Sequence, residues 1–288
     1  VVLMDSQGCA LYPALLYCDQ RSLPQVDKIV DRIPRSDYEA TIGNRLVPGT
    51  CAVTSMRWLR DEMPGEYAAA QTLGFANTFF VSQLTGASIT DPTNAALSGL
   101  ADIRDPWRWS VELCQALGIE QGYLPEIAET AHAVGKVTPA AGAETGLRAG
   151  TPVVVGCGDA VASAFGAGAR LGGPAVYSAG STDCLATVMP GPASGGALVN
   201  CAYVGRETWL GIGTTTSSGV SVQWFVREFL SSGDLALMSK LAASSPPGSN
   251  RLLYLPYLQG ERTPVWDSQA RGLFIGLTAS TGRSALAR

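Results

Sequence analysis

The sequence predicts an α/β protein in two parts, and three observations support this class. The β-branched run at 153–155 is followed by two glycines and then by a small, apolar, helix-compatible segment, the pattern of a short buried strand that leads into a helix. The chain before this run is rich in helical spacing, whereas short strands and turns predominate after residue 170. This change predicts a boundary at about 170–173, with domains over 1–170 and 171–288.

Composition favours a globular protein and argues against several function classes. The 288 residues are 46% hydrophobic and 15% charged, with a formal net charge of −4, which is typical of a chain with a large core. No run of Lys or Arg occurs, so we expect no nucleic-acid partner. The most apolar stretch, 153–169, is interrupted by Asp159 and four glycines, so we expect a strand and a helix there and no membrane span.

The cysteines and the histidine are not spaced as metal ligands are. Seven widely spaced cysteines without a CxxC pair, together with the single histidine His132, do not match a zinc site. We interpret the cysteines as reduced core residues of a cytoplasmic protein, and His132 as a solvent-exposed residue of a polar connection.

The first half is predicted to be mostly helical. It opens with a hairpin-like pair of strands, 1–4 and 14–17, with the turn marked by Asp5, Gly8 and Pro13. Helical spacing then predicts helices over 25–40, 53–63, 66–73, 78–84 and 110–117. Asn94 is expected to cap a further short helix, and 119–150 is expected to be a looser connection.

Short strands dominate the second half. They are predicted at 174–177, 185–189, 198–203, 208–212 and 252–255. A Gly/Ser/Thr loop leads into an amphipathic helix near residue 219, and a second helix is expected at 234–243. The chain begins on a strand without an initiator Met or signal peptide and stops within the apparent helix 280–288. We therefore interpret it as an interior piece of a longer protein.

Asp159 stands where the predicted strand at 153–155 meets the following helix. A carboxylate at the carboxyl end of a strand lies where open α/β sheets bind ligands, and the helix dipole favours its charged form. An N-cap without any functional role is equally compatible with this position. Both interpretations remain open on this stretch alone.

Two Gly/Ser/Thr turns, 179–182 and 217–219, could hold a phosphate through backbone N–H groups and hydroxyls. Most such turns are only turns, and no GxxxxGK[ST] motif is present, so a P-loop enzyme is excluded. The segment VVVGCGDAV is similar to the start of a dinucleotide fingerprint, but Val161 stands where a glycine is needed. An NAD-dependent dehydrogenase is the alternative from another enzyme class.

Six segments carry motifs that occur in one fixed order along the chain. They are YCDQR (17–21), LTGASITDPTNAALSGLADI (84–103), GCGDAVASAFGAG (156–168), SAGST (178–182), SSGVSVQWF (217–225) and LPYLQGERTPVWDSQARGLFIGLT (255–278). The last of these is the most specific. In this order the segments resemble those of the FGGY carbohydrate kinases, and of their xylulokinase-like branch in particular.

The resemblance implies the actin-like ATPase fold, with two ribonuclease-H-like α/β domains, incomplete here at both termini. Domain 1–170 would be the remainder of the sugar side, and 171–288 the first part of the nucleotide side. It implies phosphorylation of a sugar hydroxyl by ATP with Mg²⁺, the acceptor being a ketopentose such as xylulose or a related polyol. Asp159 would be the general base that takes the proton of the attacking hydroxyl.

The resemblance also implies which residues form the site. The nucleotide would be bound by Gly180, Ser181, Thr182, Gly219 and Gln223, and the sugar by Asp159, Ala160, Asp19 and Arg21. Asp19 and Arg21 could equally form only a local ion pair. The chain departs from the family at Ala160, where many members have Asn or Gln, and at Ser55, where a Lys is usual.

Partners and activity follow from the same resemblance. We expect a small-molecule sugar or polyol as partner, and a homodimer is compatible because the family often forms dimers. A degenerate, sugar-binding member without turnover is the alternative from a non-enzyme class. Residues 1–288 alone are expected to have little or no kinase activity.

Overall fold

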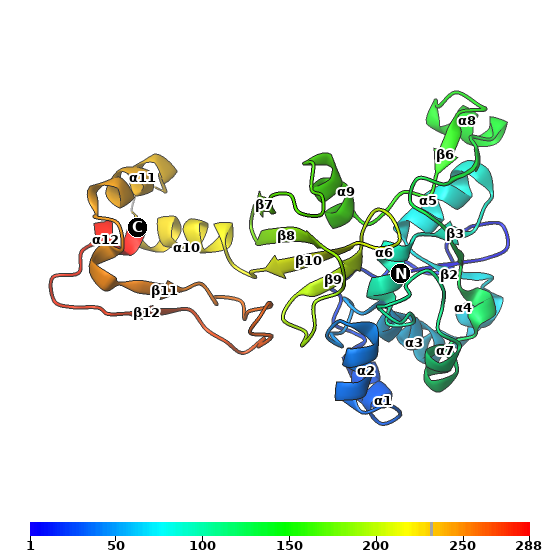
Figure 1. The fold of residues 1–288 in the computed structure, drawn as a ribbon, viewed down its shortest axis with the longest axis horizontal. Coiled ribbons are helices and arrows are strands. Elements are labelled where there is room, and N and C mark those ends of the chain that lie inside the picture. The colour runs from blue at the N-terminus through cyan, green and yellow to red at the C-terminus, as the bar shows by residue number, and fades with distance from the viewer. Residues whose placement is uncertain (231–232) are drawn as a thin grey trace. The chain divides into compact units, whose positions relative to one another are not determined.

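The chain divides into two compact units. The computed structural model describes residues 1–230 and 233–288 (Figure 1). The first unit comprises Val1–Val176 and Thr187–Ile212, and the second comprises Tyr177–Ala186 and Gly213–Arg288. The predicted assignment of a sugar-side and a nucleotide-side domain stays a prediction.

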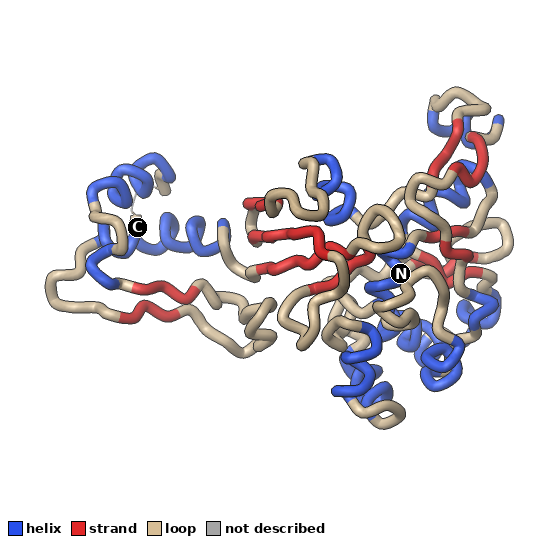
Figure 2. Tube along the Cα trace, in the orientation of Figure 1, coloured by secondary structure: helices blue, strands red, loops and turns tan. Residues whose placement is uncertain are grey.

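Helices and short strands build the first unit (Figure 2). Its helices are α1 (Leu23–Val30), α2 (Arg35–Ile42), α3 (Ala52–Glu62), α4 (Pro64–Ala69), α5 (Ala76–Thr85), α6 (Pro92–Ser98), α7 (Val111–Leu117), α8 (Pro139–Thr145) and α9 (Asp159–Gly166), with a 3-10 turn at Gln121–Tyr123. Its strands are β1 (Val2–Met4), β2 (Thr72–Gly74), β3 (Ile89–Thr90), β4 (Glu126–Ile127), β5 (Ala133–Lys136), β6 (Pro152–Val154) and β9 (Val199–Ala202). The pairs β1–β2 and β5–β6 are antiparallel, and β3–β4 is parallel.

The remaining strands form a four-stranded sheet and a separate pair. The sheet has the order β7 (Val176–Ala179), β8 (Asp183–Met189), β10 (Trp209–Thr214), β9. The second unit also contains α10 (Gly219–Phe229), α11 (Leu235–Ser244), α12 (Arg283–Ala287), a 3-10 turn at Ser249–Arg251, and the antiparallel pair β11 (Leu253–Leu255) and β12 (Leu273–Ile275). Strands β9 and β10 are antiparallel, with Trp209 opposite Ala202.

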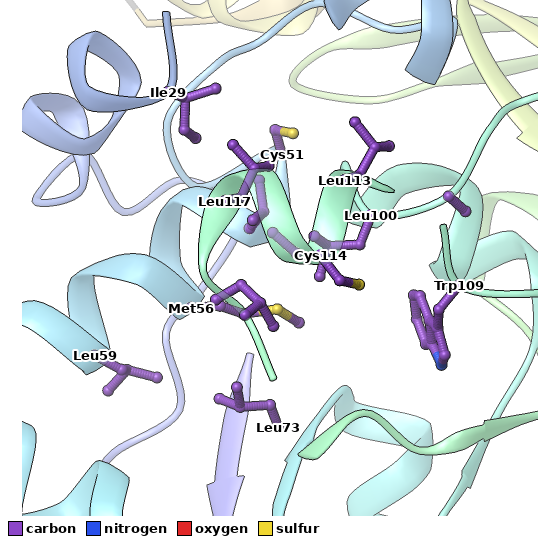
Figure 3. Packing of buried hydrophobic residues seen from close by; sticks show 14 of the residues in the cluster. Ile29, Cys51, Met56, Leu59, Leu73, Leu100, Trp109, Leu113, Cys114 and Leu117 are labelled. Carbon is purple, nitrogen blue, oxygen red and sulfur yellow. The ribbon is translucent and has the colours of Figure 1, made fainter. Parts of the chain in front are cut away.

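The main hydrophobic core lies in the first unit, around the apolar face of α3. Val53 and Met56 are fully buried, and Leu59 is 1% exposed, as the spacing of an amphipathic helix requires. Figure 3 shows Met56 and Leu59 among side chains from α7 and β2, such as Leu117 and Leu73. This core fixes the helices of the first unit against each other.

A reciprocal pair of asparagines joins β9 to the end of α2. The Asn200 N–H donates to Asn44 Oδ1 over 2.8 Å, and Asn44 Nδ2 donates to the Asn200 carbonyl over 2.9 Å. Asn200 Nδ2 also donates to the carbonyl of Gly43 over 2.6 Å. Asn200 is fully buried, and these bonds satisfy a polar side chain that would otherwise destabilise the fold. The segment 187–212 thereby belongs to the first unit.

Most predicted elements are confirmed within a few residues, and two helix predictions are wrong. The single helix expected at 25–40 is broken into α1 and α2 at Pro34, which cannot continue the first helix. The helix expected at 66–73 ends early, because Leu73 pairs with Leu3 in the β1–β2 ladder. Tertiary pairing overrides local helix propensity at this point.

Three other predictions need correction. Strand β1 pairs with β2 and not with residues 14–17. Residues 14–17 lie beside β1, with a 2.9 Å hydrogen bond from the Leu15 N–H to the Val1 carbonyl. Pro13 has no N–H group to donate, so a regular ladder does not form there. The supposed connection 119–150 contains β4, β5 and α8. The cap of α6 is Asp91 and not Asn94.

Only some of the cysteines lie in the core. Cys51, Cys114 and Cys201 are buried, whereas Cys9 and Cys18 are exposed, so the core interpretation is wrong for these two. His132 is exposed, as predicted. Among the described residues, no helix is both long and apolar enough to cross a membrane.

Met56→Ala tests the central role of the α3 face. We expect the free energy of unfolding to fall by about 2–5 kcal/mol, because truncation leaves a cavity in a packed core. Leu23→Ala on α1 is the matched control: Leu23 is 58% exposed, so its truncation should change stability by about 0.5 kcal/mol or less. Urea denaturation of both variants measures the difference, and equal losses would contradict this view of the core.

Candidate functional site

Asp159 is the first residue of α9, and its carboxylate is exposed to solvent. The N-cap is Gly158, and no side chain caps this helix. Asp159 Oδ1 accepts one bond, of 2.7 Å, from the neighbouring Ala160 N–H. The purely capping interpretation of Asp159 is therefore wrong, and the carboxylate is accessible to a ligand.

The strand before Asp159 is in the predicted place but is not buried. Val154 is 49% exposed and Val153 is half-buried, whereas Val155, just beyond β6, is buried. Strand β6 pairs with β5 alone, in an antiparallel ladder, so its two faces are not covered as they would be in a parallel sheet. Gly156 has φ +76°, which allows the sharp turn that follows.

Asp19 and Arg21 form the local ion pair that the sequence left open. Arg21 Nε lies 2.9 Å from the Asp19 carboxylate, and Arg21 Nη1 donates to Tyr12 Oη over 3.2 Å. The Arg21 guanidinium also lies over the Trp58 ring at 5.1 Å. The hydrogen bond from Arg21 lowers the pKa of the Asp19 carboxyl. Both side chains are thus held in one place, and sugar binding by them stays a prediction, as it does for the exposed Ala160.

The two Gly/Ser/Thr turns come together within the second unit. The Gly219 N–H donates to the Gly180 carbonyl over 3.0 Å, and the Ser218 N–H donates to the Ser181 carbonyl over 3.1 Å. A Cβ on Gly219 would overlap the carbonyl of Gly180, so only glycine allows this approach. The sequence identified both turns, and the structure shows that they are one double loop, residues 180–182 and 217–219.

Donors for an anion remain in this double loop. Within the part of the chain that the structure describes, the N–H groups of Ser181 and Thr182 make no hydrogen bond. Ser181 is exposed and Thr182 is half-buried. Consecutive unpaired N–H groups of this kind form a concavity that favours anions. Gln223 is exposed on α10, one turn after Gly219 and on the same helix face.

Asp183 holds the double loop together, and the sequence reasoning missed it. Its carboxylate accepts hydrogen bonds from Tyr177 Oη, from Ser218 Oγ at 2.5 Å and from the Gly180 N–H at 3.4 Å. The bonds from Ser218 and then Tyr177 lower the pKa of Asp183. The available signal was a carboxylate directly after the turn 179–182, which suits a local hydrogen bond to that turn.

No protein-built metal cage is present among the described residues, since none of their His, Cys, Asp and Glu side chains form a group of three or more. Mg²⁺ commonly binds through phosphate oxygens, waters and only one or two carboxylates. Binding of Mg²⁺ together with a nucleotide stays a prediction for the residues present.

Comparison with known proteins connects this geometry to one family. Residues 1–166 match the FGGY family of carbohydrate kinases, N-terminal domain, and residues 175–288 match its C-terminal domain. The chain is 28% identical over 285 residues to xylulose kinase of Bacillus subtilis, covering 98% of this chain and 56% of that protein. It is 30% identical over 298 residues to glycerol kinase of Thermococcus gammatolerans, covering 100% and 58%.

The fold agrees with solved structures of the same family. The crystal structure of xylulose kinase from Rhodospirillum rubrum superposes with a TM-score of 0.90 at 27% identity, over 100% of this chain and 58% of that one. The predicted fold class, the actin-like α/β fold of these kinases, is confirmed. The chain spans little more than half the length of these relatives.

The role of Asp183 can be tested by its titration. Ser218→Ala removes the largest cause of its lowered pKa, so we expect the pKa to return toward the ordinary Asp value. The pKa of Asp183 is lower in the folded than in the unfolded protein. Its hydrogen bonds therefore stabilise the fold fully at pH values above the pKa of the unfolded state, and this stabilisation is lost as the pH falls through the pKa of the folded state. Carboxyl NMR signals followed against pH measure the shift.

Ser217→Ala is the matched control for this titration. The Ser217 hydroxyl is buried and has no hydrogen-bond partner among the described residues, so its removal should leave the Asp183 pKa unchanged. An unaltered Asp183 titration in Ser218→Ala would contradict the proposed pairing.

Proposed function

Because the chain belongs to the FGGY family of carbohydrate kinases, we propose that it carries the base and the phosphate loops of a sugar or polyol kinase. ATP with Mg²⁺ would supply the terminal phosphoryl group. The sugar would bind on the 1–170 side and the nucleotide on the 171–288 side. Matches in both halves favour this activity over an NAD-dependent dehydrogenase.

The double loop is the observation that carries the proposal. The N–H groups of Ser181 and Thr182, which make no hydrogen bond among the described residues, suit phosphate oxygens, and the backbone of the loop is fixed by Gly219 and Asp183. Main-chain donors of this kind bind phosphates without a lysine counter-charge. Gly180, Ser181, Thr182, Gly219 and Gln223 are accordingly the proposed nucleotide residues.

Asp159 is the proposed general base. Its carboxylate is exposed and keeps acceptor capacity beyond its single bond to the Ala160 N–H. It would accept the proton of the sugar hydroxyl as that oxygen attacks phosphorus. Phosphoryl transfer depends on positioning and charge stabilisation, and one such acceptor within hydrogen-bond reach of the nucleophile suffices.

The sugar is proposed to be a ketopentose such as xylulose, or a related polyol. Relatives of this chain include a xylulose kinase, a gluconokinase and a glycerol kinase. Ala160 offers no side-chain amide to the substrate beside Asp159, so hydroxyl recognition would depend on other residues. Asp19 and Arg21 are the proposed candidates on the sugar side.

Asp159→Asn in the full-length protein tests the base. We expect kcat to fall by about 100- to 10,000-fold, with sugar affinity largely kept, because the amide cannot accept the proton. ADP release with xylulose, gluconate and glycerol measures the rate. The control is Asp27→Asn, which alters an exposed acid on α1. Full activity in Asp159→Asn would overturn the assignment, and no turnover by the unaltered protein on any acceptor would favour a degenerate, non-catalytic member.

Gly219→Ala tests the nucleotide loop. The new Cβ would push against the Gly180 carbonyl, so we expect the KM for ATP to rise at least about 10-fold, or about 1.4 kcal/mol of lost binding. The KM for the sugar should change little. Gly191→Ala is the control, because no atom lies within 4 Å of the place its Cβ would take and its φ is not positive. Equal KM values for ATP in both variants would contradict the loop assignment.

A further inference from the structure

A hydrogen-bond network around a buried carboxylate contacts the turn at residues 155–158, which immediately precedes Asp159. Asp91 is fully buried and caps α6. Its Oδ1 accepts bonds from Asn77 Nδ2 at 3.0 Å and from Asn94 Nδ2 at 2.6 Å. Its Oδ2 accepts bonds from the Thr93 N–H at 2.8 Å and from the Thr93 hydroxyl. The carboxylate is therefore saturated by donors from two helices, α5 and α6.

The network reaches the turn at both of its ends. The Thr93 hydroxyl accepts a bond of 2.9 Å from the Gly158 N–H, and Asn77 Nδ2 lies 3.4 Å from the carbonyl of Val155. Residues 155–158 are thus held to the same carboxylate at their first and last members. Gly158 immediately precedes Asp159, so its position sets where α9 and its first carboxylate begin.

The Thr93 hydroxyl is the central link in this network. It donates its single proton to Asp91 and accepts from Gly158, so the direction of both bonds is fixed. Hydrogen bonds to an ionised acceptor are stronger than neutral ones. Burial raises the pKa of Asp91, while bonds from Thr93 and Asn94 act in the opposite direction. Such a group is retained in a core only when its donors are in place.

A cap of α6 alone does not account for this arrangement. The cap needs only the bond from the Thr93 N–H to Asp91. The hydroxyl bond to Gly158 joins residues that are 65 positions apart in the sequence, and it adds nothing to the α6 cap. Its effect is to fix the backbone next to Asp159.

We propose that Asp91, acting through Thr93, is a positioning residue for the base Asp159. This inference rests on the proposed function, since it needs Asp159 to be the group that accepts the proton. The network holds the Asp159 carboxylate in a fixed position. The hydroxyl of the sugar can then donate its proton to that carboxylate without a prior rearrangement of the protein. A displacement of about 1 Å at such a group can lower a rate about 100-fold.

Thr93→Val tests the link, because it keeps the side-chain shape and removes the hydroxyl. We expect kcat of the full-length protein to fall about 10- to 100-fold, with KM values for sugar and ATP nearly unchanged, and hydrogen exchange at the Gly158 amide to become faster. Thr93→Ser keeps the hydroxyl and should retain most of the kcat and most of the protection of the Gly158 amide from exchange. Thr78→Val is the matched control, because Thr78 is fully buried and its hydroxyl has no hydrogen-bond partner among the described residues.

A double-variant cycle separates positioning from plain stability. In an Asp159→Asn background, Thr93→Val should cost no further rate, whereas its effect on the melting temperature should be the same in both backgrounds. An unchanged kcat in Thr93→Val, beside an impaired Asp159→Asn, would overturn the positioning role and leave the proposed function intact. A fully active Asp159→Asn would overturn both, since no base would then be positioned.

Discussion

The saturated carboxylate of Asp91 is the interaction on which the arrangement of the first unit's polar site depends. A charge in an apolar interior is tolerated only if every lone pair meets a donor. Here those donors come from Asn77 on α5, and from Thr93 and Asn94 on α6. Satisfying one group therefore aligns two helices and the turn before α9 at the same time, and an exposed carboxylate, Asp159, is presented as a result.

In the second unit, contacts between main-chain groups, and not a buried charge, hold the double loop in position. Gly219 lets two loops approach until their main chains share hydrogen bonds. The carboxylate of Asp183 accepts a further hydrogen bond from the Ser218 hydroxyl. The first unit thus offers a side-chain acceptor and the second offers main-chain donors. Proton removal and anion binding, the roles proposed here for Asp159 and for the double loop, are separate chemical tasks, and each unit has a group that suits one of them.

The sequence allowed the local features of this site to be predicted, because local chemistry determines them. Two glycines before Asp159 indicated a turn into a helix, and the turns 179–182 and 217–219 were identified from their composition. The partners were harder to predict: Asp91 and Asp183 act through residues brought close by the fold. Burial of 153–154 was wrongly predicted because it depends on which strands cover β6, and apolar composition alone does not show that.

The Asn44–Asn200 pair has a consequence for how the protein is made. It links positions 156 residues apart, and 187–212 completes the first unit. A nascent chain on the ribosome therefore cannot finish this unit when residue 176 emerges, although most of the unit has by then been translated. The carbonyl of Gly43 has no Asn200 donor until β9 has been translated, so the first unit is completed only after the first residues of the second unit have been made.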